Sequence, residues 1–352
     1  MAMYITALLM ILIFAGAIYL KSGSCRSLKN FDINTTQPLR GLLALLIVSH
    51  HLGQRTAIPY VSGICGSIGL VVVAAFFFMS GYGLGYSYIR KGNAYMNGFL
   101  RKRLSKIVPL FLFLTLSIMV ATQLASSTTI AEHLEAFAYN GKTPLPHSWF
   151  IFAIIYVYIV FRLSAFIGKT PVRTGFWFLG SCAVYVIFLS LVIDWPLYWY
   201  ATIMTTSLGY FVVLYEKKIR QMLIRHCMVS YGLIVLALFL SFCIMCKIRV
   251  VPDLWIILWN IVEAFAIYVI VCTFGMIRWR PLLIVATFSL ELYLIHGLPL
   301  KFWKVFIGVT NDYALWFLTF ACAIPMAYVA NLIFQPTVYK RAYNKVSAIV
   351  RN

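Results

Sequence analysis

The sequence predicts an all-α protein, a polytopic bundle of transmembrane helices. Of its 352 residues 62% are apolar, whereas 29 are Lys or Arg and 9 are Asp or Glu. One soluble core could not bury that much apolar surface, and several runs reach the length of about 20 residues that spans a bilayer. The runs lack the period-two alternation of a membrane barrel, so helices are the way in which this backbone satisfies its hydrogen bonds in lipid.

We expect about eleven spans, which comprise one extra N-terminal span and ten core spans. No Lys or Arg precedes the first run, whereas a secretory signal peptide begins with positive charge, so we expect this run to remain as a helix. The domain prediction is an extra helix with a cytoplasmic linker at 1–37, a membrane domain at 38–340 and a short basic cytoplasmic tail at 341–352. The expected spans are, in order, 3–20, 38–53, 67–88, 105–125, 149–166, 176–193, 197–215, 229–246, 255–276, 282–300 and 313–335.

Lys and Arg residues gather in alternate loops of this arrangement. One set of loops holds 23 of the 29, and the other set holds Arg55, Lys142, Lys247, Arg249, Lys301 and Lys304. Cytoplasmic loops carry an excess of Lys and Arg, so the N-terminus is expected outside and the C-terminus in the cytoplasm. The net charge of +20 then reflects topology and contact with the lipid bilayer, and no nucleic acid partner is expected.

Polar residues in the second expected span are candidates for catalysis. Arg40 lies near its inner end, and His50 and His51 lie near its outer end. Eleven residues make about three helical turns, which places His51 on the face of Arg40 and His50 about 80° away. A neutral imidazole is a suitable general base for a hydroxyl group. The alternative is that both histidines simply end the helix at the membrane interface.

A basic run follows the third expected span. Arg101, Arg103 and Lys106 fix topology by their charge in one interpretation, and bind a phosphorylated cytoplasmic ligand in the other. Ser80 and Gly81 precede this run within a glycine-rich stretch. Glycine lets either a neighbouring helix or a slender ligand approach the backbone closely, and the sequence leaves both possibilities open.

The tenth expected span carries a further polar set. Tyr293 and His296 share one helical face with Ser289, and Glu291 is expected on another side. Glu291 and Glu263, in the preceding span, are buried carboxylates that need a partner or a proton. Trp149 opens the fifth expected span beside His147 and is a further candidate, with an aromatic anchor at the membrane interface as the alternative to a role in the site.

These motifs together resemble those of the acyltransferase-three family of integral membrane O-acyltransferases. The resemblance covers most of the chain, because the motifs occur in the family's order. They are Pro38 to His51, the Phe-rich stretch ending at Tyr82, the basic run ending at Pro109, Trp149-Phe150 and Ser289 to His296. The extra N-terminal span and Lys106, where Arg is commoner, depart from the family's pattern.

The resemblance implies transfer of an acyl group, commonly acetyl, from cytoplasmic acetyl-CoA or another acyl-CoA to an extracytoplasmic glycan or its lipid-linked precursor. By position, Arg40 and His51 fall on the family's Arg and His, and Arg101 and Arg103 on its basic motif. The expected location is the bacterial cytoplasmic membrane. The eight cysteines lack metal-ligand spacing, and no metal is expected.

Two other classes of protein remain as alternatives. A transporter or flippase of a lipid-linked or anionic solute explains the spans and the intramembrane charges equally well. It predicts inverted repeats and paired broken helices, which the sequence does not reveal. A structural subunit of a glycan-assembly machine would leave the Arg and His residues without a role.

Overall fold

The computed structural model describes residues 2–22, 27–126, 129–247 and 252–335. Its regular elements in these ranges are all helical, which confirms the predicted all-α class for this part of the chain. The expected tail at 341–352 lies outside the described residues. The α-helices are α1 (Ala2–Lys21), α2 (Ile33–Gly53), α3 (Val61–Ser67), α4 (Gly69–Lys91), α5 (Phe99–Leu104), α6 (Val108–Ser126), α7 (Ile130–Asn140), α8 (Trp149–Gly168), α9 (Pro171–Ile187), α10 (Met204–Leu214), α11 (Glu216–Arg225), α12 (Cys227–Lys247), α13 (Asp253–Phe274), α14 (Arg280–Thr287), α15 (Ser289–Ile295), α16 (Gly297–Lys301) and α17 (Asp312–Phe334).

The helices are those of a multi-pass membrane protein, but the expected count of eleven spans is not confirmed. Among the described residues, 7 helical segments are long and apolar enough to cross a membrane, or up to 8 if one bent pair counts as a span. The three expected spans outside this count are α1, α6 and α2, and for α1 and α6 the described side chains cover only Ile5–Lys21 and Val108–Leu124. Polar residues at both ends of α2 leave it only a short apolar centre.

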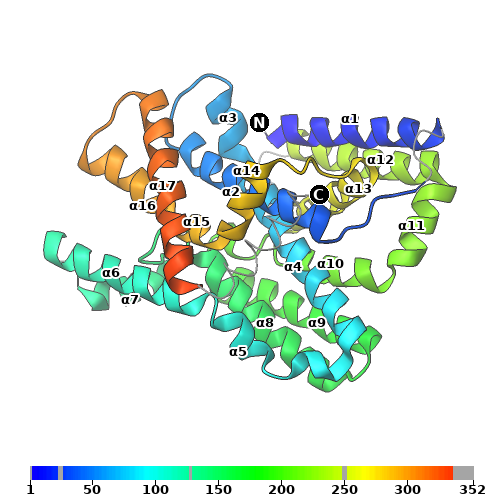
Figure 1. Cartoon of the computed structure of the whole chain (residues 1–352), viewed down its shortest axis with the longest axis horizontal. Coiled ribbons are helices and arrows are strands. Elements are labelled where there is room, and N and C mark those ends of the chain that lie inside the picture. The colour runs from blue at the N-terminus through cyan, green and yellow to red at the C-terminus, as the bar shows by residue number, and fades with distance from the viewer. Residues whose placement is uncertain (1, 23–26, 127–128, 248–251, 336–352) are drawn as a thin grey trace.

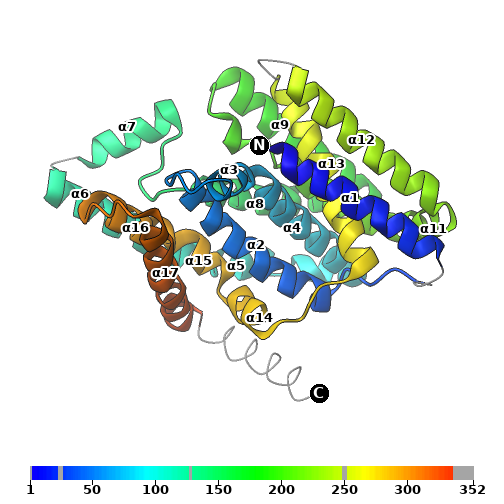
Figure 2. The ribbon, with the colours of Figure 1, turned by 90° about the horizontal axis from the view of Figure 1, so that it is seen from above.

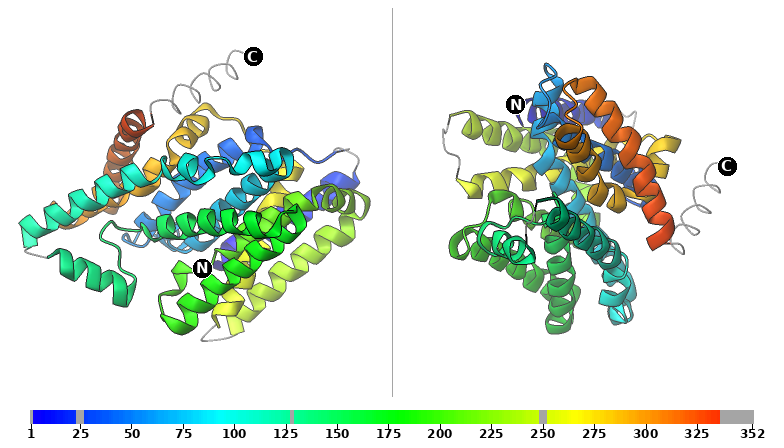
Figure 3. Two further views of the ribbon diagram at one scale, coloured as in Figure 1. Left: turned by 90° about the horizontal axis from the view of Figure 1, so that it is seen from below. Right: turned by 90° about the vertical axis from the view of Figure 1, so that its left-hand side faces the viewer.

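The helices form two groups along the longest dimension of the molecule. Figure 1 shows α6, α7, α16 and α17 at one end and α1, α11 and α12 at the other. Figure 2 places α2, α4 and α8 between the two groups. In Figure 3, α6 projects beyond the bundle and α7 turns back from its tip. The central helices carry the site described below.

The extra N-terminal helix is held by a polar contact deep in the bundle. α1 packs against α12 and α13. Thr6 Oγ1 on α1 donates to Glu263 Oε1 on α13 at 3.0 Å, and both residues are buried. A buried carboxylate is costly without a partner, so this bond answers the need that the sequence raised for Glu263.

Gly81 lies where α4 and α10 approach each other most closely. A Cβ atom added at Gly81 would lie 1.7 Å from the carbonyl oxygen of Thr206. In the reverse direction, a Cβ atom at Gly209 would lie 2.1 Å from the oxygen of Phe78. Small residues allow this approach between membrane helices. Gly81 therefore lies in a tight helix contact, and its predicted role in binding a ligand stays a prediction.

The expected span at 282–300 is broken. Its chain forms α14, α15 and α16, and the axis bends by 70° between Arg280–Thr287 and Ser289–Phe306. Irregular backbone at membrane depth is tolerated where it is buried in protein or lines a cavity. The break places the first turn of α15 on the wall of the first cavity described below.

Candidate active site

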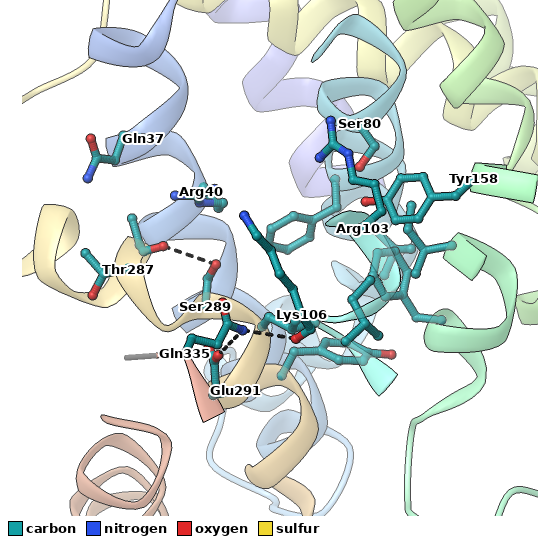
Figure 4. A pocket seen from close by; sticks show the side chains of 18 residues that line it. Gln37, Arg40, Ser80, Arg103, Lys106, Tyr158, Thr287, Ser289, Glu291 and Gln335 are labelled. Carbon is teal, nitrogen blue, oxygen red and sulfur yellow. Dashed lines mark hydrogen bonds between the residues drawn. The ribbon is translucent and has the colours of Figure 1, made fainter. Parts of the chain in front are cut away.

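One half of the site, called the inner half because the distribution of charge predicts that end of α2 to be cytoplasmic, is a cavity of about 300 Å³ that is rich in cations. Arg40 comes from α2, Arg103 from α5 and Lys106 from the turn after α5, and all three line this cavity. Figure 4 shows their side chains entering the same space from different elements. An adjoining cavity of about 500 Å³ shares Arg40 and Arg103 and extends toward Asp32 at the start of α2. The two cavities together can accept an elongated anionic ligand.

Aromatic residues orient the guanidinium group of Arg103. Its Nη2 atom donates to the Tyr95 hydroxyl at 2.7 Å. Its Cζ atom lies 5.4 Å from the ring centre of Tyr158 and 5.8 Å from that of Phe99. These contacts are within the range of cation–π attraction. Arg103 is therefore held in place before any ligand arrives.

Glu291 is a carboxylate on the wall of the cavity of about 300 Å³. It accepts from Asn331 Nδ2 at 3.0 Å and from Gln335 Nε2 at 2.6 Å. Gln335 also donates to the Lys106 carbonyl at 3.0 Å, which ties α17 to the basic run. Arg40 attracts this carboxylate without forming an ion pair within 4.0 Å in the described structure. Arg40 thus keeps its donors open to the cavity.

The outer half of the site is a cavity of about 770 Å³ near the other end of α2. His50 and His51 line it, together with His147, Trp149 and Tyr198. Lys142, which belongs to the segment between α7 and α8, also lines this cavity. This cavity differs from the inner one because its chemistry is carried by imidazoles rather than by cations.

Three histidines that are far apart in the sequence meet beside the outer cavity. The ring centres of His51 and His147 lie 3.5 Å apart, and His296 lies 5.1 Å from His51 and 5.5 Å from His147. The angles between ring planes are 26°, 18° and 18°, so the rings stack. The tertiary fold therefore joins α2, the start of α8 and α15 at one point.

Hydrogen bonds define which nitrogen of His51 can accept a proton. His50 Nδ1 lies 3.1 Å from the carbonyl oxygen of Cys65, which only accepts, so Nδ1 donates and Nε2 of a neutral His50 accepts. The Gln54 amide nitrogen meets that Nε2 at 3.2 Å. Gln54 Oε1 then faces His51 Nδ1 at 3.2 Å and accepts from it. Nε2 of a neutral His51 is left with its lone pair.

His296 is held in the same tautomer by backbone carbonyl groups. Its Nδ1 lies 2.7 Å from the oxygen of Tyr293 and 3.2 Å from that of Leu292. Both partners only accept, so Nδ1 carries the hydrogen and Nε2 carries a lone pair. That Nε2 is fully buried and has no hydrogen-bond partner in the described structure. A buried acceptor of this kind needs a donor such as a hydroxyl group.

His147 has a strained backbone conformation, which a hydrogen bond from Tyr293 helps to hold. Its φ angle of 63° is in the left-handed region, which is uncommon for a residue other than glycine. The Tyr293 hydroxyl donates to the His147 carbonyl group. Strained residues persist where the surroundings hold them, and they gather at functional sites.

Val73 and Tyr293 lie at the boundary between the two cavities, which we call the partition. Both residues line the inner cavity and the outer cavity, so the cationic half adjoins the histidine half there. Arg40 and His51, three helical turns apart on α2, stand on opposite sides of this partition. The arrangement allows two ligands to enter from opposite ends and meet at Tyr293.

The family assignment follows from a match to the acyltransferase domain of the acyltransferase-three family over residues 39–335. The match covers most of the chain. This protein belongs to the acyltransferase-three family. No curated protein and no solved structure matches the chain significantly. The protein is thus a multi-pass membrane acyltransferase, and α1 precedes the matched region.

The acyltransferase brings together most of the residues that the sequence singled out. Ser80 and Ser289 line the inner cavity, Tyr293 lies at the partition, and Trp149 lines the outer cavity. Glu291, expected on a different face from Ser289, lines the same cavity. Both side chains reach the cavity because it lies at the end of the helix, beside the first turn of α15.

Two of the predicted donor-binding residues lie elsewhere in the acyltransferase. Arg101 is exposed on α5 and does not line the described cavities. Gly81 is in the contact with α10. The sequence did not single out Gln54, which lines the outer cavity. It also did not predict that His147 stacks against His51. The only sequence signal for Gln54 is its spacing of four and three residues from His50 and His51, which is one helical turn.

The three stacked histidines raise the question of a metal ion. One nitrogen from each of His51, His147 and His296 lies within 4.8 Å of the others. Nearly parallel rings do not direct their lone pairs to one point, as tetrahedral coordination at about 2.0–2.1 Å requires. The prediction that the acyltransferase needs no metal stays a prediction, which metal analysis of purified protein would test.

Proposed function

We propose that the protein transfers an acyl group, most simply acetyl, from cytoplasmic acyl-CoA to a hydroxyl group of an extracytoplasmic carbohydrate. The observation that carries this proposal is the pair of cavities that meet at Val73 and Tyr293. One is lined by cations that suit a polyphosphate ligand, and the other offers an imidazole that suits a hydroxyl ligand. The proposal assigns the donor to the first and the acceptor to the second.

The inner cations would bind the donor. Arg103 and Arg40 line both parts of the inner cavity and would hold phosphate groups of the CoA moiety. The slender pantetheine arm would extend along Ser80 toward Tyr293, which brings the thioester to the partition. The basic run would then lie at the cytoplasmic face of the bacterial cytoplasmic membrane, with the N-terminus outside, as the distribution of charge predicts.

His51 would act as the general base. Its Nε2 atom takes the proton of the acceptor hydroxyl group while the hydroxyl oxygen attacks the thioester carbonyl carbon. The carbon–sulfur bond breaks, an ester bond forms, and the protonated His51 returns the proton to the departing thiolate, which leaves as free CoA. A covalent acyl-histidine intermediate is the alternative route.

The acceptor would occupy the outer cavity. Trp149 and Tyr198 line it, and their ring centres lie 5.7 Å apart. Aromatic faces with a nearby lone-pair acceptor suit a sugar, which presents apolar C–H surfaces and hydroxyl donors.

The test is acyl transfer by purified protein in lipid vesicles. Labelled acetyl-CoA is supplied with a glycan acceptor, and the product is analysed for an alkali-labile ester. We expect wild-type protein to form the ester and His51→Ala protein at the same level to form none. Absence of any ester with every acyl-CoA and glycan supplied to wild-type protein would contradict the proposal.

A further inference from the structure

The few cations expected on the outer side gather beside the histidines. The side chains of four of the six are described, and each lines a cavity of the outer half. Lys142 lines the outer cavity itself. Arg55, Lys301 and Lys304 line a smaller pocket of about 130 Å³. Because topology disfavours Lys and Arg on this side of the membrane, their presence at one place needs a cause other than topology.

We name the smaller pocket the cation pocket, after Arg55, Lys301 and Lys304. His147 lines both the cation pocket and the outer cavity, so the two are adjacent. Lys304 pairs with Asp312 at 3.7 Å, which offsets one of the three charges. Among the described residues, none that lines the cation pocket is acidic. Arg55 and Lys301 therefore leave it positively charged and suited to an anion of the size of a phosphate group.

An apolar groove adjoins the cation pocket on its other side. This groove, of about 700 Å³, shares Lys301 and Pro146 with the cation pocket. Its walls come from α6, from α16 and the π-helical turn Phe302–Phe306 that follows it, and from α17. Figure 1 shows these elements together at one end of the molecule. Most of its lining is apolar, and includes Ile118, Leu298, Phe302, Trp303, Phe306 and Met326.

The groove faces the surroundings of the bundle rather than its core. The side chains of Phe302 and Phe306 are 47% and 67% exposed. In a multi-pass membrane protein such apolar exposure faces lipid. The groove thus gives a hydrocarbon chain a route from the bilayer to Lys301, and the cation pocket leads on to His147.

We propose that the acceptor glycan is carried on a lipid phosphate, whose hydrocarbon chain lies in the groove and whose phosphate group lies in the cation pocket. The order of features along the molecule matches the order of parts in such a ligand, with hydrocarbon first, phosphate second and sugar at the histidines. A soluble acidic glycan would account for the cations but not for the groove. This inference rests on the proposed function and specifies its acceptor.

The first experiment measures binding without turnover. Purified protein in neutral detergent is titrated with a long-chain polyprenyl phosphate and, separately, with the matching polyprenol, and complexes are counted by native mass spectrometry. We expect the phosphate to bind about tenfold more tightly than the alcohol, because a charged hydrogen bond contributes about 1.5–3 kcal/mol. Equal binding of phosphate and alcohol would overturn the inference, as would equally tight binding of an ordinary anionic glycerophospholipid.

Variants test whether the cation pocket causes the preference. The double variant Arg55→Gln/Lys301→Gln should lose it, and Arg55→Lys/Lys301→Arg should retain most of it. Lys218→Gln, which removes an exposed charge from α11, is the matched control and should behave like wild type. A preference that survives in Arg55→Gln/Lys301→Gln protein would overturn the assignment to this pocket.

The second experiment compares two acceptors in the transfer assay. One is a glycan linked to polyprenyl phosphate, and the other is the same glycan released from its lipid. We expect KM for the linked acceptor to be about tenfold lower, and the double variant to remove this advantage. Equal KM values would overturn the acceptor role. Absence of transfer to either acceptor, with the binding preference intact, would contradict the proposed function but support the lipid phosphate site.

Discussion

The two ends of α2 carry different chemistry. At the inner end Arg40 opens onto a cavity with Arg103 and Lys106, where permanent charges are placed by hydrogen bonds and aromatic rings. At the outer end His51 sits in a chain of neutral hydrogen-bonding groups that leaves one lone pair available. The inner half is built to hold a charged ligand, whereas the outer half is built to accept a proton.

The difference predicts that binding and catalysis can be separated by mutation. Loss of an inner cation should weaken donor binding and leave the proton transfer step intact. Loss of an outer imidazole should do the reverse. The two halves meet only at Val73 and Tyr293, so we expect little coupling between them.

The largest effect is expected for His51→Ala. Removal of a general base usually lowers the rate by about 10²–10⁴-fold, and donor affinity should be unchanged because His51 contacts no inner cation. His50→Ala should cost less, because His50 reaches His51 through Gln54 and a ring contact at 4.8 Å and is not itself the proposed base. The measurement is acyl transfer in membranes with equal protein levels. An inactive His50→Ala protein beside an active His51→Ala protein would refute this assignment of the base.

The next effect concerns the inner cations. Arg103→Ala should weaken acyl-CoA binding roughly 10- to 150-fold, as expected for loss of charged hydrogen bonds of about 1.5–3 kcal/mol. Arg101→Ala should have a smaller effect, because Arg101 is exposed and lies outside the described cavities. Equilibrium binding of labelled acyl-CoA measures both variants. If Arg101→Ala weakens binding as much as Arg103→Ala does, the donor lies outside the inner cavity.

The effect of Gly81→Ala on stability distinguishes the two interpretations of Gly81, as a helix contact or as access for a ligand. Gly81→Ala should destabilise the protein by about 1–3 kcal/mol, because the new methyl group overlaps the Thr206 carbonyl oxygen. Gly180→Ala is the control, since a Cβ atom there has no neighbour within 4 Å. Thermal unfolding in detergent compares the two variants. An unchanged Tm with weaker donor binding in Gly81→Ala protein would restore the interpretation of ligand access.

The smallest effect is expected for Gln54→Leu. The substitution removes the hydrogen bonds that the Gln54 amide group makes to His50 and to His51. Because a hydrogen bond contributes about 0.5–1.5 kcal/mol, the transfer rate should fall about fivefold. Donor KM should stay the same. Nitrogen-15 NMR of labelled histidine should show a mixed His51 tautomer in Gln54→Leu protein. A single Nδ1–H tautomer in both proteins would show that Gln54 does not set it.

The helical class and the family could be predicted from the sequence, because both depend on local patterns. Apolar runs are visible without tertiary contacts, and the spacing from Arg40 to His51 is a property of one helix. The count of spans was not predictable in the same way. α2 gives part of its length to polar residues of the site, and the span at 282–300 is bent by 70° to form the cavity.

The meeting of His51, His147 and His296 could not be predicted from the sequence. The three residues belong to segments more than 90 positions apart, and only the packing of α2, α8 and α15 joins them. His147 looked like an interfacial anchor because its backbone strain and its contact with Tyr293 leave no local pattern. Gly81 shows the opposite case, in which a motif residue serves the fold while its neighbour Ser80 lines the cavity.

The most direct test of the account is transfer across a sealed membrane. Vesicles with the protein in one orientation receive labelled acyl-CoA on the side of the basic run and enclose the glycan acceptor on the other side. The account predicts labelled ester inside wild-type vesicles, none inside His51→Ala vesicles, and no label without the protein. Ester that forms only when donor and acceptor share one side would contradict a site with two opposed entrances.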